Sequence, residues 1–595
     1  MWFPDQQALA AATPGTQFVA LRWHEFFDVF TPDSFQPRVC QLPTLVDEVA
    51  LAADDVVRDP RFKTHLSQVQ AELSRKLKGE VEAAVCTQKE IYLLGRILKS
   101  DDAVAIRDIA NHLRQDGFAV EFEQRLLGDA ERMIPGLLAA TPVKKESAEI
   151  WLGALATLAL HRGYLKRDDP LVFDNALLGR SVTEILAEIR TKLQHVVRPY
   201  DCILEVVLSP EVIGLAEEPR AAVMSQLNAV LRKVAGELPQ QDLVGTSSPH
   251  RILVHRRVEA TGSRTALLRF VADLQPALNL LDLYRNGPTT VSIRSGWVGP
   301  TMEALVKTEI GFVTLQKLHP RREASELTLR VLAMHETEGP LDGDITSALE
   351  LYHVAMTTED RRVRFLTLWS AMECLGHAVD GDSVMERVAK LVVPIVVWRR
   401  IEKHLRYLTI SFKFARDWKP GLKAAAVPGL PNATDTKVFL EDVLESVTKP
   451  DGDLRLASLG AQAGSHSLLI WRTKVAWDTF HSPAHLKDDL LSARERLEWQ
   501  VGRIYRARNG LIHRGHESPL LDHLTNNLQY YFSTTISRLL HGISGKNDRN
   551  AREAAFRWCS QSDYLMDRLA NSPSDIVISD VVPAPARGHG VKLWP

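Results

Sequence analysis

The spacing of apolar residues along the chain predicts a mainly helical protein with one section of a different texture. Up to about residue 170, and again from about residue 340, apolar residues recur three and four positions apart, the period of an amphipathic helix; the stretches 62–85 and 104–118 show it clearly. Between these regions, short runs rich in β-branched residues predict strands at 202–208, 251–258 and 289–295, and helical patterns lie between them at 219–237 and 264–285. This arrangement is typical of a small α/β unit within a helical protein.

Breaks in the pattern divide the chain into sections. A Gly- and Asp-containing break at 338–344 precedes the second helical region, and a Pro-rich stretch at 419–434 predicts a loop inside it. The predicted sections are a helical N-terminal region at 1–198, a small α/β domain with a sensor or regulatory role at 199–340, a helical bundle at 341–545, a terminal helix at 546–571 and a Pro-containing tail at 572–595.

Composition and charge narrow the functional classes. The 595 residues are 45% hydrophobic and 25% charged, with a net charge of −2, so any nucleic-acid site must be a local patch. The longest apolar runs, 151–160 and 391–398, are shorter than the ~18 residues that a membrane span needs. The N-terminus has no basic segment of the kind that begins a signal peptide, and the five cysteines are scattered. We therefore expect a cytoplasmic protein without membrane contact, disulfide framework or Cys-rich zinc site.

Several common catalytic motifs are missing from the sequence. It contains no phosphate-binding loop of the G-x-x-x-x-G-K-[ST] type, no G-x-G-x-x-G, no H-E-x-x-H and no G-x-S-x-G. We expect neither a nucleotide cofactor nor a catalytic metal.

One stretch, RIYRARNGLIHRGH at 503–516, differs from the rest of the chain. It holds four arginines and two histidines, and no acidic residue occurs before Glu517. In a nearly neutral chain this is a local positive patch of the kind that a phosphate backbone requires. The arginines are Arg503, Arg506, Arg508 and Arg514.

Arg508 has a special position in this stretch. It continues an apolar stripe formed by Leu497, Val501 and Ile504 on the preceding helix. A guanidinium on such a stripe needs a carboxylate or a phosphate, because a buried charge without a partner is costly. Gly510 is predicted to end the helix, which would place Asn509 and His513 near its terminus.

The spacing Arg508-Asn509-x-x-x-His513 resembles the R-[ND]-x-x-x-H motif of HEPN domains, which are helical bundles that pair as dimers and often act as metal-independent ribonucleases. Upstream, RVRFLTLWSAMECLG at 362–376 is similar to the first-helix signature of the Apea-like HEPN branch, in which an aromatic-Leu helix carries a glutamate, here Glu373. The resemblance covers roughly 345–545. A second copy of the short motif, Arg107 to His112, lacks both the basic surroundings and the upstream helix.

The resemblance implies an endoribonuclease that leaves 2′,3′-cyclic phosphate and 5′-hydroxyl ends on RNA, with transfer RNA among the candidate substrates. His513 would transfer a proton, since histidine titrates near neutral pH, and Arg508 would donate to phosphate oxygens. Asn509 would bind the phosphate or orient the histidine, or else cap a helix end. In the family two such motifs meet across a dimer interface, so the resemblance also implies a homodimer.

Glu373 borders the apolar stripe of its own helix, and this suggests a pair with Arg508, which would be either a supporting salt bridge or a contact that aims the guanidinium at substrate. Arg503, Arg506 and Arg514 are candidates for RNA contact or for a solvated surface.

Three functions remain open. The first is an Apea-like HEPN ribonuclease, controlled by its N-terminal region through an unidentified trigger, in prokaryotic anti-phage defence or as a growth-arresting toxin. The second is an inactive HEPN scaffold that dimerises and binds RNA or a protein, in which Arg508 and His513 are structural. The third and weaker one is a nucleotide-modifying or nucleotide-sensing site in 201–300, which lacks paired carboxylates beside a Gly-Ser turn.

Overall fold

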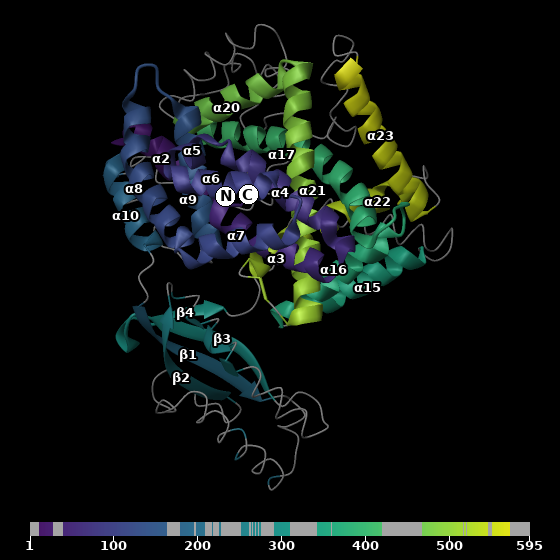
Figure 1. Ribbon diagram of the computed structural model, residues 1–595, viewed down its shortest axis with the longest axis horizontal. Coiled ribbons are helices and arrows are strands. Elements are labelled where there is room, and N and C mark those ends of the chain that lie inside the picture. Colours follow the sequence, from purple (N-terminus) through teal and green to yellow (C-terminus); the bar gives the residue numbers. More distant parts are fainter. Residues whose placement is uncertain are drawn as a thin grey trace. The chain divides into compact units, whose positions relative to one another are not determined.

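The computed structural model describes most of the chain's helices and one β-sheet (Figure 1). It describes residues 11–27, 40–162, 179–194, 198–208, 251–260, 291–309, 342–418, 467–544 and 550–571 apart from a few single positions, and scattered positions between 217 and 274. The described part is mainly helical with a small antiparallel sheet, which confirms a mainly α protein with a small α/β unit. Its contacts form two compact units: Met1–Leu158 with Pro170–Lys192 and Leu315–Pro595, and Ala159–Asp169 with Leu193–Thr314.

The helical unit begins with a series of short helices. These are α2 (Pro14–Phe27), α3 (Leu42–Arg58), α4 (Lys63–Leu77), α5 (Glu80–Val85), α6 (Gln88–Lys99), α7 (Ala103–Gln115), α8 (Phe118–Ala139), α9 (Lys145–His161) and α10 (Val182–Leu193). The helix predicted at 104–118 is α7, whose first turn is capped by the Asp102 carboxylate accepting from the backbone N–H of Val104. The helix predicted at 62–85 is interrupted near Gly79 and forms α4 and α5.

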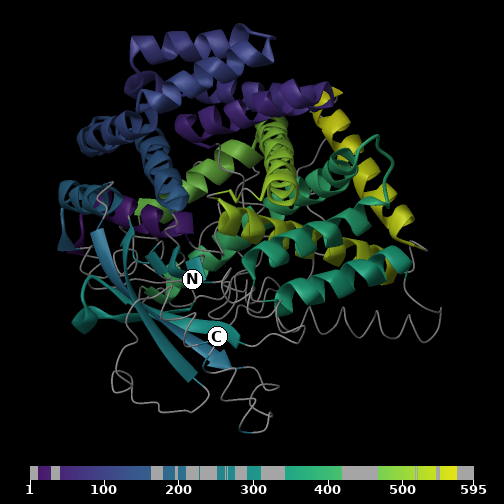
Figure 2. The ribbon, with the colours of Figure 1, turned by 60° about the horizontal axis from the view of Figure 1, so that its bottom comes forward.

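The C-terminal helices of the same unit are longer. They are α15 (Gly343–Thr357), α16 (Arg361–Gly376), α17 (Val384–Trp418), α20 (Ser467–Phe480), α21 (Pro483–Arg514), α22 (Leu521–Ser544) and α23 (Ala551–Asn571). In Figure 2 these helices, coloured teal to yellow, pack side by side. The apolar stripe predicted on α16 lies in their core, because all four of its side chains are at most 1% exposed: Phe365, Leu368, Met372 and Leu375.

Buried ion pairs connect the N-terminal and C-terminal helices. The carboxylate of Glu25 on α2 accepts from Arg22 of the same helix and from Arg472 of α20, with N–O distances of 2.9 and 2.7 Å. Arg22 also pairs with Glu149 of α9 at 2.7 Å. The sequence assigns α2 and α20 to separate regions, 1–198 and 341–545, whereas the contacts place both helices in one compact unit.

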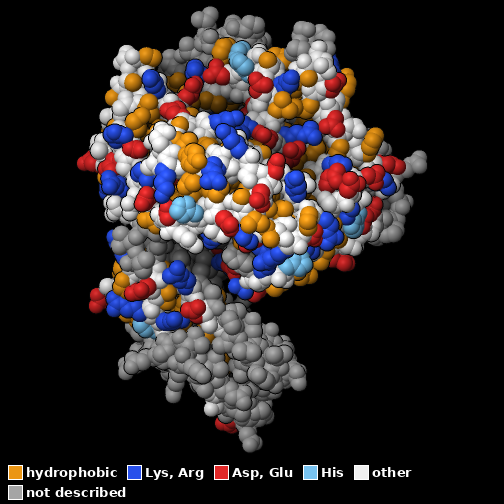
Figure 3. Space-filling model, in the orientation of Figure 1, with side chains coloured by type: hydrophobic (Ala, Val, Ile, Leu, Met, Phe, Trp, Pro, Cys, Tyr) orange, Lys and Arg blue, Asp and Glu red, His pale blue; other side chains and the backbone are white. Residues whose placement is uncertain are grey.

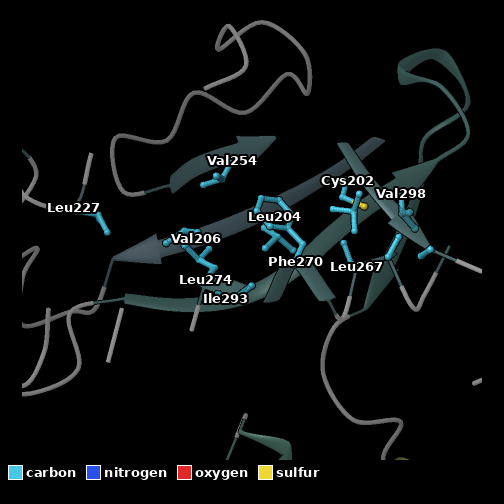
Figure 4. Packing of buried hydrophobic residues seen from close by; sticks show 13 residues of the cluster. Cys202, Leu204, Val206, Leu227, Val254, Leu267, Phe270, Leu274, Ile293 and Val298 are labelled. Atoms are coloured by element: carbon cyan, nitrogen blue, oxygen red, sulfur yellow. The ribbon is translucent and has the colours of Figure 1, made fainter. Parts of the chain in front are cut away.

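The second unit contains a four-stranded antiparallel sheet with strand order β2-β1-β3-β4. Its strands are β1 (Arg198–Leu208), β2 (Arg251–Ala260), β3 (Val291–Gly299) and β4 (Val306–Glu309). The three predicted strands are confirmed, and β4 is an addition. Alternate residues of β1 point to one face, where Cys202, Leu204 and Val206 pack against Phe270 and its neighbours (Figure 4). The helices predicted at 219–237 and 264–285 lie largely outside the described residues, as do the loop at 419–434 and the tail at 572–595.

Among the described residues, no helix is long and apolar enough to cross a membrane.

Candidate active site

The helix that carries the arginine-rich motif is longer than the sequence indicates. α21 continues through Gly510 to Arg514, and Gly515 ends it with a left-handed φ of 61° while its N–H bonds to the carbonyl oxygen of Leu511. The predicted helix end at Gly510 is therefore wrong. A glycine inside a helix costs only about 1 kcal/mol, and packing of α21 offsets this. As a result, His513 lies in the last turn of a helix and not in a loop.

Arg508 lies at the end of the apolar stripe of α21, as its spacing from the stripe residues predicts. Leu497, Val501 and Ile504 on this stripe are at most 3% exposed, and the Arg508 side chain is 25% exposed. Its Nη2 atom is 3.9 Å from Oε1 of Glu373 on α16. The two helices thus bring together the guanidinium and the carboxylate that their separate patterns suggested as a pair.

An aromatic cluster holds this pair in place. Trp369, 1% exposed on α16, donates from Nε1 to Glu373 Oε1 at 2.5 Å. Its ring lies 5.7 Å from the ring of Tyr505 on α21, which in turn meets His65 of α4 edge-on at 5.5 Å. Because these side chains are closely packed, the Glu373 carboxylate has little freedom to move away from Arg508.

Only some of the N–H donors of the Arg508 guanidinium are hydrogen-bonded to protein groups. Its Nη1 donates to Oδ1 of Asn509 at 3.0 Å, while 3.9 Å to Glu373 is too long for a hydrogen bond. Its Nε is buried and has no hydrogen-bond partner among the described residues. Nη2, whose contact with Glu373 is too long for a hydrogen bond, therefore keeps N–H donors that a phosphate could use.

His513 is exposed at the end of α21. Five residues of α-helix turn through 500°, so Arg508 and His513 leave the helix about 140° apart. Asn509, four residues before His513, shares its face. Asn509 accepts a hydrogen bond from Arg508 and lies one helical turn before His513.

The structure corrects the role of Arg503. Its side chain is 4% exposed, its Nη2 pairs with Glu72 of α4 at 2.6 Å, and its Nε pairs with Glu48 of α3. A third hydrogen bond goes to Gln500 at 2.9 Å. Because the guanidinium is buried among these partners, we no longer expect Arg503 to contact RNA.

Burial and charge act in opposite directions on the two carboxylates that share Arg503. Burial opposes ionisation of Glu48, but the guanidinium groups of Arg503 and Arg506 outweigh it and hold the pKa of Glu48 below its ordinary value. Burial raises the pKa of Glu72, because Arg503 compensates it less fully. Arg503 with Glu48 and Glu72 thus forms a buried ion-pair cluster that joins α21 to the N-terminal helices, and we call this cluster the internal anchor.

Arg506 and Arg514 also have acidic partners on α3. Arg506 Nη2 lies 2.7 Å from Glu48 Oε2, with the Arg506 side chain 13% exposed. Arg514 pairs with Asp55, and both side chains are 26% exposed. The sequence does not identify these acids as partners, because acidic residues on an amphipathic helix are ordinarily predicted to face solvent.

The positive patch is thus largely neutralised within the chain. On the face of the helical unit shown in Figure 3, acidic and basic side chains are interspersed. The described residues hold no group of three or more His, Cys, Asp or Glu side chains placed to bind a metal ion.

No family model, curated protein or solved structure matches this chain. The resemblance to HEPN domains rests on the motif residues and their surroundings alone.

The second copy of the short motif lies in a different environment. Arg107 on α7 pairs with Asp108 at 3.1 Å and with Asp54 at 3.6 Å, and His112 lies 3.5 Å from Asp116. Both motif side chains contact acids on the surface, and the motif offers a natural control for experiments on Arg508 and His513.

His65 makes the contact between α4 and α21 sensitive to acid. Burial, and then the charge of Arg506, lower the pKa of His65 from 6.5 to about 4. The neutral form is therefore favoured in the folded protein, and stability is complete above pH ~6.5 and falls as the pH drops toward 4. We expect the free energy of unfolding to fall by about 2 kcal/mol more between pH 7 and pH 5 in the wild type than in His65→Leu.

Urea denaturation followed by circular dichroism at the two pH values measures this difference. His353→Leu, at an exposed position on α15, is the control that should retain the wild-type pH dependence. Equal pH dependence in the wild type and in His65→Leu would contradict the prediction.

Proposed function

We propose that the protein is a metal-independent endoribonuclease of the HEPN type. The observation that supports this is the state of Arg508: a guanidinium set by Glu373 and Asn509, with donors not taken up by protein, on the helix that ends in an exposed His513. Arg508 would bind the phosphate and stabilise the charge that develops on it, and His513 would transfer a proton.

The reaction that these groups favour is attack of the RNA 2′-hydroxyl on the adjacent phosphorus. The new P–O bond closes a 2′,3′-cyclic phosphate while the bond to the 5′-oxygen breaks. One proton leaves the 2′-hydroxyl and one reaches the departing 5′-oxygen, which yields a 5′-hydroxyl end. A histidine can perform either transfer, because its ordinary pKa lies near neutrality.

A homodimer suits this chemistry. One chain projects Arg508 and His513 from different sides of α21, so a second copy would supply the missing group on the other side of the phosphate. We propose pairing through the helical bundle, action on RNA in the cytoplasm, and control by the N-terminal helices in phage defence or growth arrest.

Cleavage of total and transfer RNA by the purified chain in EDTA tests the proposal. We expect fragments with 2′,3′-cyclic phosphate and 5′-hydroxyl ends, at a rate that chelation does not change, because the proposed groups need no metal. Loss of cleavage in EDTA, or 5′-phosphate ends, would rule out this mechanism.

One observation favours the alternative of an inactive HEPN scaffold. Arg503, Arg506 and Arg514 are all engaged by acids of the same chain, as in a segment whose charges serve packing. A scaffold would bind RNA or protein without cleavage, and replacing His513 by alanine would leave that binding unchanged.

A further inference from the structure

The end of α21 is lined by carboxylates from the N-terminal helix α3. Glu48 and Asp55 are seven residues apart, two turns of helix, so they project from the same face of α3. Glu48 contacts Arg506 and Asp55 contacts Arg514. The face of α3 that contacts α21 thus carries acidic residues opposite Arg506 and Arg514 of α21.

The two contacts differ in burial. Glu48 also binds the 4% exposed Arg503 and is held by two guanidinium groups, so it is part of the internal anchor. Asp55 and Arg514 are each 26% exposed. An exposed ion pair adds little to stability, whereas removing one partner of a buried pair is costly. The pair at Arg514 can therefore open while the anchor at Arg503 stays closed.

Arg514 follows His513 directly in the last turn of α21. A guanidinium binds carboxylate and phosphate oxygens with the same planar fork of N–H donors. A carboxylate on Arg514 therefore occupies a position that an RNA phosphate could take.

We propose that Asp55 is a built-in competitor of RNA: it occupies Arg514 in the free protein, and an RNA phosphate displaces it on binding. This inference rests on the proposed ribonuclease site and adds a residue of the N-terminal region that controls access to it. In the wild type, RNA gains the contact with Arg514 only by breaking an ion pair, so this contact adds little affinity.

The neighbouring acid provides a matched control. Asp54 lies on the same helix, is 38% exposed, and contacts Arg107 of α7 at 3.6 Å. Asp54→Asn and Asp55→Asn change the net charge of the chain by the same amount, but only the second frees Arg514.

The test measures binding of a fluorescent single-stranded RNA 20-mer by the full chain at several salt concentrations. His513→Ala is present in every variant so that the RNA stays intact. We expect Asp55→Asn to tighten binding about threefold to fivefold, and Asp54→Asn to change it less than twofold. The slope of log affinity against log salt should be similar in Asp55→Asn and in the protein with Asp55, because Arg514 meets a phosphate in both complexes.

Arg514→Gln separates this competition from a general charge effect. Added to Asp55→Asn, it should remove the whole gain in affinity, whereas alone it should have little effect, because Arg514 is already occupied. Thermal melting of each variant verifies that the helical unit is folded. Equal affinities for Asp54→Asn and Asp55→Asn, or a gain that survives Arg514→Gln, would overturn the inference.

Cleavage assays with intact His513 distinguish this outcome from failure of the proposed function. Tighter binding by Asp55→Asn without cleavage by any variant would support the competitor and reject the nuclease. Cleavage by the wild type with no difference between the two asparagine variants would support the nuclease and reject the competitor.

Discussion

His513→Ala and Arg508→Ala are each expected to lower the rate of RNA cleavage by roughly 10²- to 10⁴-fold, the usual contribution of a proton-transferring group or of a charge-stabilising donor. His513 is exposed and Arg508 is partly exposed, so neither change removes a large buried contact. Cleavage of a fluorescent RNA and toxicity on expression are the measurements, with circular dichroism to verify folding.

The chain contains its own control for this experiment. Arg107→Ala and His112→Ala make the same substitutions in the second copy of the motif, which is also exposed on a helix. These variants should cleave RNA at the wild-type rate. Full activity of either His513→Ala or Arg508→Ala would show that the site is elsewhere.

Arg503→Met is expected to lower the free energy of unfolding of the helical unit by about 3–5 kcal/mol. The substitution removes the charge between Glu48 and Glu72, which leaves Glu72 buried without its cation while Glu48 keeps Arg506. Methionine retains part of the side-chain volume, so the decrease in the free energy of unfolding reflects mainly the loss of the Arg503 charge. Urea denaturation followed by circular dichroism measures it.

Arg132→Met on α8 is the control for this prediction. Arg132 is 74% exposed and, within the part of the chain that the structure describes, pairs with Asp129 alone, so its replacement should cost less than about 1 kcal/mol. If Arg503→Met unfolds like the control but weakens RNA binding, Arg503 contacts RNA after all and the anchor is not needed for stability.

Local patterns in the sequence were sufficient for much of the fold and for one part of the site. The spacing of apolar residues predicts α7, α16, α21 and three strands, because amphipathic period depends on residues near one another in the chain. The same reasoning placed Arg508 on the stripe of α21 and Glu373 at the border of the stripe on α16. Their contact follows once two apolar stripes pack together.

The partners of the other arginines depend on the tertiary structure. Arg503, Arg506 and Arg514 look like one positive patch in the sequence, yet they pair with acids that precede them by more than 400 residues. A helix pattern shows which face is buried but not which element covers it. The charge of a segment is also a local property, whereas neutralisation depends on which distant helix packs against it. For this reason the sequence identifies the arginines of α21 as candidates for binding phosphate. The packing of α3 and α4 determines which of these arginines are already paired with acids of the same chain.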